Sequence, residues 1–253
     1  YATGQNITIF YQPQNNYLAN NGCVHEGKIS GKLGLPGIPS AAESVAVAEA
    51  ILLSKLTNSR LHLCRVSCLE SLMLIQSAQS EGLSVTSDVA IHQLFFDENS
   101  IDNFNSDFHV MPPFRSNEDL VALHQAVNKE TITAICSDHQ PHNEDAKQAP
   151  FSDTQPGISS IELLLPLIME LVELKIIDMS EAIAKVTSNP SEILGIGAGV
   201  IAKGLPADLC IIKKEAWLFD EAKILSAGKN NPFLGRKFNY SVDKTICDGK
   251  IVY

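Results

Sequence analysis

The sequence predicts an α/β fold of parallel strands alternating with helices, followed by a small β region. Up to residue 194, short apolar runs alternate with helical patterns, an order typical of a parallel sheet or barrel. After Gly195 this alternation stops, and glycine-rich turns separate short apolar runs. We therefore divide the chain into an α/β domain over residues 1–194 and a β domain over residues 195–253.

The α/β domain begins with a short apolar run, Asn6–Tyr11, which predicts a buried strand ended by a Gln-Pro pair. After a Gly- and Asn-rich loop, Ser40 and Glu43 have the spacing of a capping box and predict the start of a helix. Arg60–Val66 is the next predicted strand. The predicted helix that follows, Cys68–Gly82, is closed by its final glycine.

The same alternation continues to the end of the domain. It predicts strands at Leu83–Ala90 and Ile132–Cys136, and helices at Asn117–Val127, Ile158–Lys175 and Ser180–Thr187. Pro166 predicts a kink in the helix at 158–175, because proline removes a backbone donor.

The β domain has a strand signal of its own at Leu209–Ile212. Further on, Asp248-Gly249 separates two apolar runs, at Val242–Cys247 and Lys250–Tyr253. An Asp-Gly pair between two such runs predicts a tight β-hairpin.

Composition excludes several classes of protein. The chain has 253 residues, 45% of them hydrophobic, which is enough apolar material for a sizeable core. The net charge of -10 and the lack of a Lys/Arg cluster argue against a nucleic-acid binder. No apolar run reaches the roughly 18 residues of a membrane span, and the start has no signal-peptide pattern.

The six cysteines include four in strand-like apolar runs, and no Cys-x-x-Cys pair occurs. We expect them to be buried, reduced thiols of a cytoplasmic protein, with a zinc–thiolate site or a disulfide framework as the alternative.

The motif with the clearest chemistry is Ser137–His142, directly after the predicted strand Ile132–Cys136. It places the carboxylate of Asp138 and the imidazoles of His139 and His142 at one strand tip. Such a set is typical of a metal-assisted hydrolytic site in a (β/α) barrel. The structural alternative is that Asp138 caps the loop that follows it.

Separated segments along the whole chain match one enzyme family in the family's own order. They are His25–Lys28, Leu33–Pro39, Leu61–Ser67, Val85–Val89, Pro112–Arg115, Ser137–His142, Ala149–Phe151 and Asn231–Gly235. The chain therefore resembles dihydroorotases of the amidohydrolase superfamily, specifically the long type related to the multifunctional pyrimidine enzymes, and within these the degenerate, non-catalytic homologues.

The resemblance implies a (β/α)8 barrel with a small β domain built from both chain ends, of which this chain carries about strands five to eight. The first four strands have no counterpart, and the chain begins at Tyr1 rather than Met. Because half a barrel has two open edges, we expect the missing half to come from a preceding segment, or the edges to be covered in a homo-oligomer.

The resemblance also implies roles for individual residues. Asp138 matches a metal ligand that also acts as the family's catalytic proton shuttle, and His142 matches a substrate contact. Phe151 and Ser152 match a substrate contact made through the backbone. Met111 stands where the family has an asparagine.

Two further metal-ligand positions of the family are substituted, because Gln12 and Arg65 each stand where the family has a histidine. Glutamine is a poor zinc ligand, and a guanidinium has no lone pair to offer. The sequence therefore predicts no zinc, or weak zinc, at this position. We expect Arg65 to pair with Asp138 and take over the charge of the metal; the alternative is that Arg65 turns to solvent.

The other histidines and cysteines near the motifs are expected to be structural. His92 is expected to be a packed loop residue, with a site residue as the alternative, and His62 is expected to face the helix layer. Cys64 and Cys68 span the end of a strand and the start of a helix, so we do not expect a metal pair.

Three functions remain open. The first is a degenerate dihydroorotase homologue that assembles with aspartate carbamoyltransferase. The second is an active, zinc-dependent dihydroorotase that interconverts dihydroorotate and N-carbamoyl-aspartate; Asp138 would be its general acid/base, His142 would hold the substrate carboxylate, and its other ligands would lie in the missing segment. The third is a cyclic amidohydrolase with another substrate, which the Pro-Pro-Phe-Arg and Asn-Pro-Phe-Leu-Gly motifs argue against.

Overall fold

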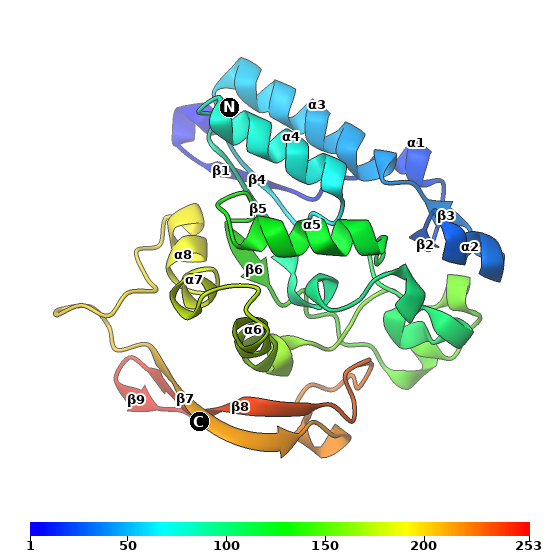
Figure 1. The fold of residues 1–253 in the computed structure, drawn as a ribbon. Helices are drawn as coiled ribbons and strands as arrows, with labels where there is room; N and C mark the ends of the chain where they lie inside the picture. The colour runs from blue at the N-terminus through cyan, green and yellow to red at the C-terminus, as the bar shows by residue number, and fades with distance from the viewer.

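A four-stranded parallel sheet forms the centre of the computed structural model, which describes residues 1–101 and 103–253. The strands are β1 (Thr8–Tyr11), β4 (Arg60–Leu63), β5 (Val85–Ala90) and β6 (Ala134–Cys136), in the order β1-β4-β5-β6 (Figure 1). All neighbours are parallel, so their carboxyl ends meet at one edge. The predicted alternation of strands and helices is confirmed.

Three helices, α3 (Ala41–Thr57), α4 (Leu69–Ser80) and α5 (Asn117–Val127), lie side by side against this sheet (Figure 1). Every second residue of the strands, such as Leu61 and Val85, packs into the same apolar core as residues of these helices. This follows from the two-residue period of a strand, which sends alternate side chains to opposite faces. The opposite face of the sheet therefore carries the polar side chains.

The predicted helix over residues 158–175 is wrong at its start. The helix α6 spans Leu164–Glu173, so Pro166 lies in its first turn, where backbone N–H groups have no intrahelical partner and a proline therefore removes no helical hydrogen bond. Ile158 instead forms a bridge with His139, and Ser159 N–H donates to the Asn230 carbonyl. These long-range backbone bonds keep residues 158 and 159 out of the helix.

Several short elements were not predicted. Between β1 and α3 lie α1 (Asn16–Ala19), β2 (Val24–His25), α2 (Lys28–Leu33) and β3 (Gly37–Ile38), with β2 and β3 paired in parallel. Beyond α6, the predicted helix at 180–187 is shorter, α7 (Met179–Ala184), and α8 (Ser188–Leu194) follows it. Single 3-10 turns occur at Ala2–Gln5, Ile91–Leu94, Glu98–Ser100, Ser106–Phe108, Glu144–Lys147, Phe151–Asp153, Ile161–Leu163 and Glu221–Lys223.

The C-terminal region is an antiparallel sheet of β7 (Leu209–Leu218), β8 (Lys237–Cys247) and β9 (Lys250–Ile251). The predicted hairpin is confirmed, with positive φ angles of 47° at Asp248 and 77° at Gly249, the pair of values that a type I′ turn requires. The sheet lies below α6 in Figure 1, and β8 packs against that helix.

One expectation about the cysteines is wrong. All six thiols are free, but Cys210 and Cys247 are exposed rather than buried. They lie on β7 and β8, most of whose residues are exposed or half-buried. In the part of the chain that the structure describes, no helix is long and apolar enough to cross a bilayer.

Candidate functional site

The candidate site lies at the carboxyl edge of the parallel sheet, where Asp138 follows β6. Its backbone has a left-handed φ of 46°, and its side chain is 7% exposed. The carboxylate Oδ1 accepts hydrogen bonds from Arg65 Nη1 at 2.6 Å and from Gln140 Nε2 at 2.8 Å. The Asp138 carboxylate is therefore buried and fully engaged on one oxygen.

Arg65 reaches this carboxylate from the end of β4, again with a left-handed φ, of 55°. Its second terminal nitrogen, Nη2, donates to Oε1 of Gln12, which directly follows β1. One guanidinium thus joins the ends of three strands. The predicted pairing of Arg65 with Asp138 is confirmed.

This arrangement does not fit a zinc ion at the positions of Gln12, Arg65 and Asp138. Zinc needs lone pairs from imidazole, thiolate or carboxylate groups, and a guanidinium supplies none. The Arg65 cation would also repel a dication, and it already bonds Asp138 Oδ1 and Gln12 Oε1.

His92 is buried on the other side of Asp138, with its Nε2 3.9 Å from Asp138 Oδ2. Among the described residues, neither ring nitrogen has a hydrogen-bond partner, and the ring meets Phe114 edge-on with the ring centroids 5.7 Å apart. Burial lowers the pKa of His92 to about 4, which the Asp138 charge only partly offsets. The predicted packed position of His92 is confirmed, and its ring faces the candidate site.

The two histidines that follow Asp138 in the sequence hold loops in place. His139 Nδ1 accepts the backbone N–H of Ser160 at 3.0 Å. His142 donates its backbone N–H to Asn230 Oδ1 at 2.8 Å, and its ring Nε2 donates to the Pro156 carbonyl at 3.0 Å. The ring proton of His142 is therefore engaged with backbone.

The other predicted substrate positions lie in the 3-10 turn Phe151–Asp153. The Phe151 side chain is buried and stacks on His109 with ring centroids 4.9 Å apart. Ser152 is exposed, and its hydroxyl bonds the neighbouring Asp153. Among the described contacts, Asp138 is joined by Arg65, Gln140 and His92, whereas His142, Phe151 and Ser152 contact other segments.

A second polar cluster lies next to this site and was not predicted. The ring of His62, expected to face the helices, instead bonds Asp88 Oδ2 at 2.8 Å and Thr86 Oγ1 at 2.8 Å on β5. Cys64, two residues further along the chain, adds a sulfur, and the three donor atoms of His62, Cys64 and Asp88 lie within 4.8 Å of one another. The available signal was the spacing of His62 and Cys64, which puts both on one strand face.

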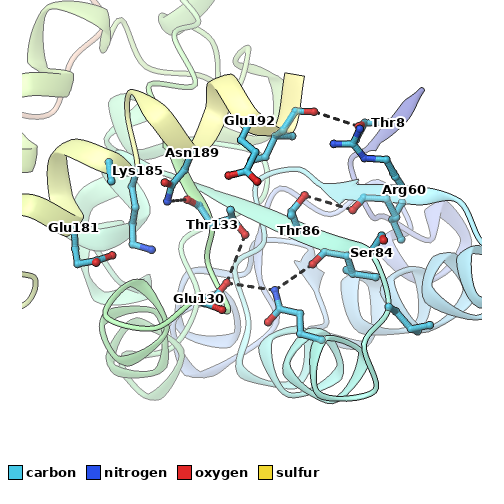
Figure 2. A pocket seen from close by; sticks show the side chains of 16 residues that line it. Thr8, Arg60, Ser84, Thr86, Glu130, Thr133, Glu181, Lys185, Asn189 and Glu192 are labelled. Carbon is cyan, nitrogen blue, oxygen red and sulfur yellow. Dashed lines mark hydrogen bonds between the residues drawn. The ribbon is translucent and has the colours of Figure 1, made fainter. Parts of the chain in front are cut away.

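A cavity of about 590 Å³ lies elsewhere, at the amino ends of the strands (Figure 2). Thr8, Arg60 and Thr133 line it from the starts of β1, β4 and β6, and Lys185 and Asn189 come from α7–α8. Asp138, in contrast, lies at the carboxyl ends of the strands, where parallel sheets ordinarily bind their ligands. The cavity and Asp138 are therefore at opposite edges of the sheet.

Comparison with known proteins agrees with the fold and the motifs. The model of the amidohydrolase family matches residues 18–252, so the chain belongs to the amidohydrolase family. Within it, the chain is 40% identical over 253 residues to a "Dihydroorotase-like protein" of Pseudomonas putida, and 37% identical over 254 residues to a "Dihydroorotase" of Geotalea daltonii. The resemblance to dihydroorotases is confirmed.

The same comparisons show how much of each relative's length the chain covers. All of this chain aligns with those two relatives but with only 60% of the length of each. Among solved structures, the L-hydantoinase of Arthrobacter aurescens matches 99% of this chain and 58% of its own, with a TM-score of 0.89 and 22% identity. At that identity the likeness concerns the fold alone.

Proposed function

We propose that this chain is the carboxyl-terminal part of a dihydroorotase homologue in which an arginine has replaced the catalytic metal. The observation that carries the proposal is the Arg65 guanidinium bonded to both Asp138 and Gln12. In the dihydroorotases that the chain resembles, these positions would hold zinc. Here they hold a buried ion pair and an amide.

The replacement is electrostatically consistent. A carboxylate that is 7% exposed needs a nearby positive charge, which a metal ion supplies in the family and Arg65 supplies here. Unlike zinc, a guanidinium cannot lower the pKa of a bound water or polarise a carbonyl as a Lewis acid. Asp138, His142, Phe151 and Ser152 are then residues inherited from the family that no longer take part in catalysis. The protein would not hydrolyse dihydroorotate.

We further propose that the parallel sheet is the second half of a (β/α)8 barrel, completed by a segment that precedes β1 or by a second copy of the chain. Support comes from the relatives, of which the chain spans 60%, and from β1, where Ile9 and Phe10 are 40% and 48% exposed. In a complete sheet or barrel, a neighbouring strand, helix or loop ordinarily covers such side chains.

The role proposed for the protein is assembly with aspartate carbamoyltransferase in the cytoplasm. It rests on the resemblance to degenerate dihydroorotases and on the net charge of -10, which suits a soluble complex. Co-purification with the transferase is the test. Unchanged assembly and activity of the transferase without this protein would refute the role.

Restoring the two histidines of the family's metal position tests whether Arg65 has replaced the metal. We expect no dihydroorotate hydrolysis by the protein, and a gain of tightly bound zinc in the double variant Gln12→His/Arg65→His. The matched control is Arg65→Gln, which removes the cation without adding an imidazole and should not gain zinc. Turnover of dihydroorotate that is lost in Asp138→Ala would overturn the proposal and favour an active, zinc-dependent dihydroorotase.

A further inference from the structure

Three side chains on neighbouring strands form a compact set of metal-type donors beneath the Arg65–Asp138 pair. His62 belongs to β4, Cys64 follows that strand directly, and Asp88 belongs to β5. Their donor atoms lie within 4.8 Å of one another, and His62 Nε2 is 2.8 Å from Asp88 Oδ2. His62 and Asp88 are buried, at 3% and 8% exposed, and Cys64 is half-buried.

The hydrogen bonds of His62 orient its ring for a ligand. His62 Nδ1 lies 2.8 Å from the Thr86 hydroxyl, and Nε2 lies 2.8 Å from Asp88 Oδ2. With the ring proton on Nδ1, the Thr86 oxygen accepts it, and Nε2 turns a lone pair toward the carboxylate, where a metal ion can bridge the two atoms.

We propose that His62, Cys64 and Asp88 bind one zinc-class divalent cation. Imidazole nitrogen, thiolate sulfur and carboxylate oxygen are the three ligand types that zinc takes in proteins. A bond from Nδ1 to a second side chain, here Thr86, is the usual support of a metal-binding histidine. The thiolate and the carboxylate together cancel the two positive charges, so the loaded site is neutral where burial penalises net charge.

The geometry needs only a small adjustment. Ligand atoms about 2.0–2.3 Å from a tetrahedral zinc lie roughly 3.3–3.8 Å apart. The His62–Asp88 pair would open from 2.8 Å to reach that separation. A water molecule would complete the coordination, and the Cys136 thiol would keep its hydrogen bond to Asp88 Oδ1, at 3.2 Å.

Without metal the thiols are protonated. Burial raises the pKa of the Cys64 thiol to about 11, and the Asp88 charge raises it further. The pKa of Cys136 is also raised, first by burial and then by Asp88. A bound cation would displace the proton from Cys64.

This site differs from the metal position of the dihydroorotase resemblance. It uses none of Gln12, Arg65 and Asp138 as ligands; Arg65 donates its backbone N–H to Asp88 Oδ1 at 2.9 Å, and its charge partly offsets the raised pKa of the Cys64 thiol. A cation there would connect β4 to β5 directly below the ion pair. The inference therefore stands or falls independently of the proposed loss of catalytic zinc.

Titration of the purified protein with Co²⁺ tests the site, because a cobalt–thiolate bond gives a charge-transfer band in the near ultraviolet. We expect a saturable band at one equivalent, displaced by Zn²⁺. Cys64→Ser should abolish the band, and the control Cys210→Ser, which removes an exposed thiol, should leave it unchanged. Thr86→Val, which keeps all three ligands, should weaken affinity about 10- to 100-fold.

Two results would overturn the inference: no thiolate band at saturating Co²⁺, or a band of full intensity in Cys64→Ser. Asp138→Asn separates the two metal positions. Metal that persists in Asp138→Asn and is lost in Cys64→Ser belongs to the His62–Cys64–Asp88 site. Metal that is lost in Asp138→Asn and persists in Cys64→Ser lies at the family position. That result would refute both this inference and the proposed function.

Discussion

The ion pair between Arg65 and Asp138 predicts a large loss of stability for Arg65→Met. Methionine keeps an apolar stem of similar shape but removes the 2.6 Å bond to Asp138 and the bond to Gln12. The Asp138 carboxylate, 7% exposed, would keep the amide of Gln140 as its donor among the described contacts. A buried charge would then lack a counter-charge within hydrogen-bonding distance.

The size of this loss follows from burial. Two unit charges about 4 Å apart attract by roughly 4 kcal/mol at an effective dielectric constant of about 20. Removing one partner of a buried pair costs about 3–5 kcal/mol, because the other charge stays buried. Arg65 is 25% exposed, and the resulting solvent screening reduces the expected loss in the free energy of unfolding to about 2–3 kcal/mol.

Urea denaturation near neutral pH measures this loss. The control is Lys55→Met, which breaks the ion pair with Glu81 in which the side chains are 57% and 49% exposed. Such a surface pair contributes less than about 1 kcal/mol. The reasoning would be refuted if Arg65→Met lowered the free energy of unfolding no more than Lys55→Met does. It would also be refuted if the effects of Arg65→Met and Asp138→Asn on this free energy were additive in a double-mutant cycle.

Three further predictions concern the surroundings of the site. Burial, and then the Lys147 charge, lower the pKa of His109 to about 4; the unfolded chain then binds more protons, so stability falls as the pH drops from about 6.5 to 4. His109→Gln should make urea midpoints fall less over that range, and an unchanged slope would contradict this. Gly228→Ala would push a Cβ atom into the His142 backbone and should lower the melting temperature by several degrees; an unchanged melting temperature would show that the loop yields freely. Glu43→Gln leaves the Arg115 guanidinium, 3% exposed, without its carboxylate and should cost about 3 kcal/mol in urea denaturation, so a loss under about 1 kcal/mol would show that the pair is dispensable.

Much of the fold could be predicted because its long elements carry strong local patterns. The helix α5 was predicted with the bounds that the structure has, and in the structure Ser116 and Asp119 form a capping box that fixes its start. The two-residue strands β2 and β3 could not be predicted, because pairing with each other, rather than any local pattern, makes them strands. The apolar pattern over residues 158–175 suggested one helix, but backbone bonds from residues 158 and 159 to distant loops keep its start out of the helix.

The candidate site divides in the same way. The meeting of Arg65 with Asp138 could be predicted, because the carboxyl ends of parallel strands share one edge. The bond of His62 to Asp88 could not, because polar and apolar residues alternate along β4 and the sequence of the strand does not show which of its two faces the helices cover. The absence of a partner for the buried His92 ring likewise depends on packing that no local pattern encodes.

By itself, the sequence determined the family, the alternation of strands and helices, and the identities of the residues at the strand ends, because these are properties of local pattern and motif order. Only the tertiary structure decided which side chains meet. It placed Arg65 between Asp138 and Gln12, turned His62 toward Asp88 and Cys64, and engaged His142 with backbone. Contacts between residues far apart in the chain depend on strand order and facing, which are set by the packing of the whole sheet against its helices.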